Sequence, residues 1–181
     1  FQLKGEIIGD TAIQLVEYDS LGFATGRVEG FTDYYTTQTK GPPTKVDLPS
    51  LEETTHRIKK ASTMLGAGMV GICELDDRWV YSHNFSRKTQ AAQKLDLPAT
   101  ISHAILLILP MDYELSKTIP SALGGATTGL GYASSLNVAT ALAQFITNLG
   151  YEAIASLNDT AQSIPMAIQA GLGEYGRNGL L

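Results

Sequence analysis

The chain has 181 residues, 44% of them hydrophobic and 17% charged, and this length and composition fit one globular domain with a buried core. Its formal net charge of −5 offers no basic surface to phosphate groups, so a nucleic-acid partner is disfavoured. No run approaches the roughly 20 apolar residues that a membrane-spanning helix needs.

The N-terminal residues 1–49 mix Gly, Thr, Tyr and Pro with short alternating stretches, which predicts an irregular wrapping segment. The sequence starts at Phe1 without a charged and apolar leader, so it carries no readable export signal. Cys73 is the single cysteine, which excludes an internal disulfide and a cysteine-rich zinc or iron–sulfur site within the chain.

The first clear helix signal begins at Ser50. Glu53 follows three residues later, which is the spacing of a capping box. Apolar residues then recur at helical spacing, and Gly66 follows them. The sequence therefore predicts a helix over about 50–66, with an apolar face formed by Leu51, Ile58, Ala61, Met64 and Leu65.

Two short apolar runs, 69–75 and 104–109, are typical of buried strands, and Pro110 closes the second. Between them, residues 76–81 predict a polar turn with large aromatic side chains, and the polar stretch 87–93 predicts a short helix.

A longer helix is expected over about 127–149, where an apolar stripe precedes Gly150 as the C-terminal cap. Residues 153–156 predict a short strand after it. The alternation of helices and strands indicates a layered domain of the α/β or α+β class over residues 50–181.

The C-terminal glycines Gly171, Gly173 and Gly176 match the spacing of a dinucleotide-binding fingerprint. That fingerprint needs a strand before it, whereas Pro165 suits the first turn of a helix there, so the nicotinamide reading is disfavoured. Glycines at this density allow either a tight turn or a close approach of backbone to a large flat ligand.

Several segments together resemble one family in order and spacing. They are 77–81 (DRWVY), 110–114 (PMDYE), 127–132 (TTGLGY), 158–165 (NDTAQSIP) and 170–181 (AGLGEYGRNGLL). The match runs from about residue 65 to residue 181 and resembles the catalytic subunits of reductive dehalogenases, and more loosely epoxyqueuosine reductases.

The resemblance implies a nitroreductase-like α+β fold, with a mixed sheet flanked by helices, that binds a corrinoid in its base-off form. It also implies two [4Fe-4S] clusters in the full-length protein, whose cysteine ligands this chain lacks. We therefore expect a chain truncated before the cluster-binding module, which would be inactive alone. The implied reaction replaces the carbon–halogen bond of a small organohalide, such as a chlorinated ethene or alkane, by carbon–hydrogen.

Site residues follow from the same resemblance. Tyr132 is implied as the proton donor and Asn158 as a substrate-pocket residue. Tyr113, between Asp112 and Glu114, is typical of an aromatic residue at the exit of a strand and is a second-choice pocket tyrosine. Without the resemblance, Tyr132 would be read as a core aromatic and Asn158 as a helix cap. The residues expected to contact the corrinoid are Gly171, Gly173, Tyr175, Gly176, Arg177 and Asn178, of which Arg177 and Asn178 could instead be turn residues.

None of the histidines His56, His83 and His103 has metal-ligand spacing, so no residue of the chain is expected to bind a metal directly. The resemblance implies a membrane anchor protein as partner, allows a homodimer, and places the protein outside the cytoplasmic membrane, peripherally attached to it. Two alternatives stay open: a tRNA-modifying enzyme like epoxyqueuosine reductase, and a corrinoid-binding module without catalysis.

Overall fold

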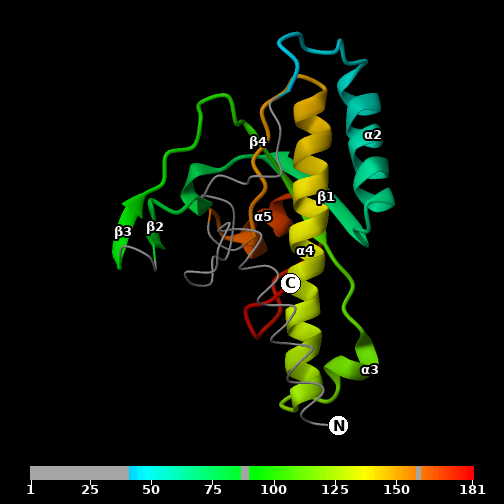
Figure 1. Ribbon diagram of the computed structural model, residues 1–181, viewed down its shortest axis with the longest axis vertical. Coiled ribbons are helices and arrows are strands. Elements are labelled where there is room, and N and C mark those ends of the chain that lie inside the picture. Colours follow the sequence, from blue (N-terminus) through cyan, green and yellow to red (C-terminus); the bar gives the residue numbers. More distant parts are fainter. Residues whose placement is uncertain (1–40, 87–89, 158–159) are drawn as a thin grey trace.

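A computed structural model of the chain describes residues 41–86, 90–157 and 160–181 (Figure 1). Of the predicted wrapping segment 1–49, residues 1–40 lie outside the described part of the chain. Residues 41–50 are described and form neither helix nor strand. The described elements are α2 (Leu51–Met64), β1 (Met69–Glu74), the 3-10 helix η1 (Asp77–Trp79), β2 (His83–Ser86), β3 (Ala91–Lys94), β4 (His103–Ile108), α3 (Tyr113–Ser116), α4 (Ala122–Asn148) and α5 (Ser163–Gln169).

The helix predicted over 50–66 is confirmed as α2. The Ser50 hydroxyl oxygen accepts a hydrogen bond from the backbone N–H of Glu53 at 3.2 Å, as expected for an N-cap. At the other end Gly66 has a φ of +119°, a conformation that glycine adopts more readily than other residues. In Figure 1, α2 lies beside α4.

Both predicted apolar strands are confirmed as β1 and β4, which pair antiparallel from Met69 opposite Ile108 to Glu74 opposite His103. They are less buried than expected, because in β1 only Gly71 is buried and in β4 no residue is. Because Gly71 has no side chain, the residues that follow α5 can pack closely against β1. A β-carbon at this position would lie 2.6 Å from the Ala170 β-carbon and 2.8 Å from Leu172 Cγ.

A second antiparallel pair, β2 and β3, runs from His83 opposite Lys94 to Ser86 opposite Ala91. The short helix predicted over 87–93 is therefore wrong where the structure describes this stretch, because residues 91–93 belong to β3. Residues 87–89 lie outside the described part. The described residues contain two antiparallel pairs and not the expected mixed sheet.

The long helix α4 begins five residues before its predicted start at residue 127. Ser121 caps it, since its hydroxyl oxygen accepts the N–H of Gly124 at 3.3 Å. Gly124 is buried, and a β-carbon there would lie 2.6 Å from Ile119 Cγ1. Glycine has a low helix propensity, so we infer that packing of Gly124 against Ile119 helps to keep this glycine-rich stretch helical. Gly150, with a φ of +86°, follows the last turn as predicted.

The strand predicted over 153–156 is wrong, because this segment has no strand pairing in the described residues. Instead it packs on α4, where Ala155 (4% exposed), Leu136 and Ala143 form a buried cluster. The helix expected around Pro165 is confirmed as α5, and Gln162 is its N-cap. The described architecture is therefore α+β, while the nitroreductase-like assignment stays a prediction. No helix in the described ranges has the length and apolar character to cross a membrane.

Candidate functional site

A cavity of about 610 Å³ lies between β4, α4 and the segment that leads from α4 into α5. This size falls in the ordinary range for small-molecule and cofactor sites. The walls come from parts of the chain far apart in sequence: Leu75, described residues of the ranges 97–109, 151–157 and 160–166, and one face of α4. Most lining side chains are aliphatic, so the cavity offers an apolar interior.

One face of α4 forms the helical wall. Tyr132, Ser135, Ala139, Ala143 and Ile146 all line the cavity, and their spacing of three or four residues puts them on one side of a helix. This face presents Tyr132 and Ile146 at its ends. Between them lie the small side chains of Ser135, Ala139 and Ala143, and Leu142 also lines the cavity from α4.

Tyr132, the expected proton donor, lies at this wall. It is half-buried and packs against the cluster that contains Leu136, Ala143 and Ala155. The Tyr132 side chain can therefore contact a molecule that is bound in the cavity. Its chemical role stays a prediction, because position alone does not assign it.

Asn158, the expected substrate-pocket residue, lies outside the described residues. The nearest described residues on either side, Leu157 and Thr160, both line the cavity. Tyr113 lies elsewhere: it begins α3, is 71% exposed, and has the Lys117 ammonium 4.3 Å from its ring centroid. The structure therefore does not bring Tyr113 together with Tyr132 at the cavity.

The C-terminal glycine segment does not line this cavity either. The expected cofactor contacts Gly171, Gly173, Tyr175, Gly176, Arg177 and Asn178 are all exposed. The chain here turns back on itself, since the N–H of Gly176 donates to the Leu180 carbonyl oxygen at 2.7 Å and the N–H of Leu180 donates to Asn178 Oδ1 at 3.2 Å. The expected common wall of Tyr132 and these glycines is thus not found in the described residues.

A polar rim, which sequence reasoning missed, lines the cavity where it meets solvent. It comprises Thr100, Ser102, His103 and Glu152, which are all exposed. The Thr100 hydroxyl donates to the Glu152 carboxylate, and Ser102 Oγ lies 2.9 Å from His103 Nδ1. These residues lie in no motif, so only the folded chain reveals them as neighbours.

Tyr151 is a second cavity tyrosine that carried no sequence signal. Its hydroxyl donates to the Val46 carbonyl oxygen at 3.0 Å, and the Lys45 ammonium lies 5.1 Å from its ring centroid. The Tyr151 hydroxyl is thus bound to a backbone carbonyl, and the residue forms part of the cavity wall.

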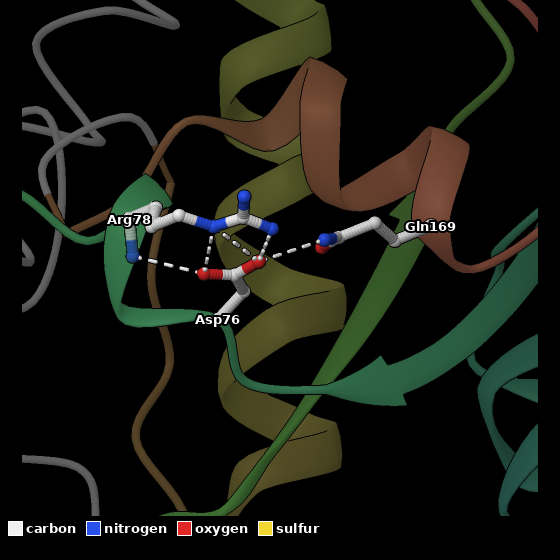
Figure 2. A network of polar contacts seen from close by, with 3 residues as sticks. All are labelled: Asp76, Arg78 and Gln169. Atoms are coloured by element: carbon white, nitrogen blue, oxygen red, sulfur yellow. Dashed lines mark hydrogen bonds and ion pairs between the residues drawn. The ribbon is translucent and has the colours of Figure 1, made fainter.

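A polar network beside the cavity connects the end of β1 to α5 (Figure 2). The Asp76 carboxylate accepts hydrogen bonds from Arg78 Nη2 at 2.6 Å and from Gln169 Nε2 at 3.0 Å. The Arg78 side chain, followed by its backbone N–H and by Gln169, holds the pKa of Asp76 well below its usual range. The network links the end of β1 to α5, which contributes Met166 to the cavity wall.

Within the described ranges, no three His, Cys, Asp or Glu side chains are grouped so that they could hold a metal ion. Cys73 is half-buried on β1, and its Sγ lies 3.7 Å from the Met166 carbonyl oxygen. Burial raises the pKa of this thiol, which keeps it protonated and unreactive at neutral pH.

No family model matches the chain. It is 40% identical, over 73% of its length, to a tetrachloroethene reductive dehalogenase of Desulfitobacterium hafniense, and 39% identical over the same share to one of Dehalobacter restrictus. A tetrachloroethene reductive dehalogenase of Sulfurospirillum multivorans is 31% identical over 76% of the chain. The chain spans only 30% of the length of the first two relatives and 32% of the length of the third.

Proposed function

This chain belongs to the reductive dehalogenases as a part-length member, and from that membership we propose that the complete protein dehalogenates a small organohalide reductively. The relatives are named for tetrachloroethene, so a chlorinated ethene is the substrate class that we propose first. The observation that carries the proposal within this chain is the position of Tyr132 on the wall of a large, mostly apolar cavity.

The proposed reaction balances as follows. The carbon–halogen bond takes up two electrons and breaks, the halide leaves with the bonding pair, and the carbon gains one proton. We assign that proton to the Tyr132 hydroxyl. A phenol keeps its proton at neutral pH but gives it to the far more basic carbon that forms as the halide leaves. Water at the polar rim can return a proton to the phenolate.

The cofactor that we propose for this cavity is a corrinoid, which supplies the two-electron chemistry at cobalt when bound. Two chemical features of the lining support this proposal. Aliphatic side chains of β4 and α4, such as Leu106 and Leu142, suit the face of a flat ring. Ser135 donates its proton to the Gly131 carbonyl at 2.8 Å, which leaves its oxygen free to accept from an amide side group of a corrinoid.

The two [4Fe-4S] clusters of the proposed enzyme need thiolate ligands. The sequence has one cysteine, Cys73, so we propose that parts of the polypeptide outside this chain hold the clusters. A membrane anchor protein as partner, a homodimer, and attachment outside the cytoplasmic membrane are proposals that rest on the family resemblance alone.

The proposal is tested with the complete protein, reconstituted with hydroxocobalamin and iron–sulfur clusters and supplied with a low-potential electron donor. We expect one chloride and one dechlorinated product for every two electrons consumed from a chlorinated ethene. Corrinoid binding without chloride release would favour the non-catalytic module. Salt-sensitive tRNA binding with reduction of epoxyqueuosine would favour the tRNA-modifying alternative.

A further inference from the structure

The antiparallel pair of β2 and β3 stands apart from the rest of the fold. Figure 1 shows it beside the helical part of the molecule, and neither strand packs closely on another described element. Every residue of β3 is exposed. A sheet of only two strands is marginally stable in water, so a further strand along its edge would stabilise it. The segment after β3 lines the cavity from Leu97 onward, so an interaction that orders β3 also supports this wall.

The outer edge of β3 carries backbone groups that can pair with another strand. The Leu95 N–H donates to the Ser82 carbonyl oxygen at 3.0 Å, which sets the hydrogen-bonded positions of the ladder. Opposite residues of antiparallel strands alternate between hydrogen-bonded and non-hydrogen-bonded pairs. Ala92 and Lys94 therefore direct their N–H and C=O groups away from β2. No described residue hydrogen-bonds to these groups, so the edge can accept one more antiparallel strand.

The side chains along this edge fit a second copy of the same strand. With a two-fold axis at Gln93, each Ala92 lies opposite Lys94 of the second copy, and the two Gln93 residues lie opposite each other. A carboxamide both donates and accepts, so the two Gln93 side chains can hydrogen-bond. A lysine on an edge strand normally opposes pairing. Here the Lys94 Nζ lies 2.7 Å from Asp96 Oδ1, which compensates its charge.

We propose that β3 pairs antiparallel with β3 of a second copy of the protein, so that the two hairpins form one continuous sheet across a two-fold axis. The family resemblance allows a homodimer but indicates no contact surface, and this edge supplies one. The contact is small and polar, so the dimer dissociates on dilution. The inference uses only the backbone and side chains of the hairpin, and it therefore does not depend on the proposed reaction.

The test measures the molar mass of the complete protein by analytical ultracentrifugation over a series of concentrations. Gln93→Lys and Gln93→Glu each put like charges opposite each other in the dimer, which opposes pairing. Asn137→Lys adds a positive charge at an exposed position of α4 and is the matched control. We expect the unchanged protein and Asn137→Lys to dimerise equally, and each Gln93 variant to dimerise at least about tenfold more weakly.

An equimolar mixture of the two Gln93 variants separates edge pairing from other causes, because lysine then lies opposite glutamate. We expect the mixture to dimerise at least as tightly as the unchanged protein. Ala92→Pro is a second test: it removes an outward N–H but no bond to β2, and it should also weaken the dimer.

Several results would overturn the inference. A monomeric unchanged protein at every concentration would do so, since the edge would then be covered within one polypeptide or left unpaired. Dimerisation of each Gln93 variant as tight as that of Asn137→Lys would place the contact elsewhere. A mixture that stays as weak as its components would contradict the pairing of Gln93 with its own copy. Gln93 variants that fail to fold by circular dichroism would show that this side chain is packed inside the molecule.

Discussion

Individual glycines show most directly how backbone geometry shapes this chain. Gly150 combines a φ of +86° with a close approach of the segment before α2: a β-carbon there would lie 2.6 Å from the Thr44 carbonyl oxygen and 2.7 Å from the Lys45 α-carbon. Both features depend on the missing side chain. The same crossing holds Val46 and Tyr151 in contact, so Gly150 also supports the cavity wall.

We predict that Gly150→Ala lowers the free energy of unfolding by about 2 kcal/mol or more, from left-handed backbone strain and the clash with Lys45. Gly125→Ala is the matched control. Gly125 lies in α4 with nothing within 4 Å of its added β-carbon, so alanine should be neutral there or stabilise by up to about 1 kcal/mol. Urea denaturation of both variants measures the difference, and equal stabilities would contradict the explanation.

Asp76 gives a prediction about pH. Its hydrogen bonds to Arg78 lower its pKa in the folded state below the ordinary value of 3.8. A carboxyl with a lowered folded-state pKa contributes stability that is present above the ordinary value and is lost as pH falls through the folded-state pKa. We therefore expect the Asp76→Asn variant to lose less stability than the unchanged protein as the pH falls below about 4.

Denaturation midpoints between pH 7 and pH 2 would measure this effect. Asp47→Asn is the control, because Asp47 is exposed and outside the network in Figure 2. If Asp76→Asn and Asp47→Asn give parallel curves over the whole range, the network does not contribute to acid sensitivity.

At the scale of elements, the start of α4 depends on its cap. Ser121 accepts the Gly124 N–H and donates to Thr118 Oγ1 at 2.8 Å. We predict that Ser121→Ala costs about 1 kcal/mol and that Ser121→Asp retains most of the stability, because aspartate also caps. Ser134→Ala, at an exposed position in the middle of α4, should change stability by less than about 0.5 kcal/mol. A cost at Ser134 equal to that at Ser121 would argue against capping.

The elements also show where sequence reasoning succeeds. Local signals sufficed for α2, β1 and β4, because the Ser50 cap, Gly66 and the apolar runs act within a few residues. Tertiary contacts decided the rest. Burial of Gly124 against Ile119 extends α4 through glycines, and packing of Ala155 on α4 takes the place of a strand pairing. Neither contact can be read from spacing along the chain.

At the scale of the whole molecule, the cavity joins segments up to about 90 residues apart along the chain, from Leu75 to Met166. The family motifs pointed to Tyr132, and the structure puts it at this cavity. They did not reveal Ser135, Ala139 or Tyr151, because none of these residues belongs to a family motif. They also suggested that the C-terminal glycines lie beside Tyr132, whereas Leu172 packs close to Gly71 and the glycines after it do not line the cavity.

The central claim is that Tyr132 donates the proton to carbon, and chloride release by the complete, reconstituted enzyme tests it directly. Tyr132→Phe is compared with Tyr81→Phe, because Tyr81 is an exposed tyrosine that does not line the cavity. We predict that kcat falls on the order of 100-fold or more with Tyr132→Phe, as expected when a general acid is removed, while Tyr81→Phe stays within about twofold of the unchanged enzyme. Undiminished chloride release by Tyr132→Phe, with corrinoid binding intact, would contradict the claim.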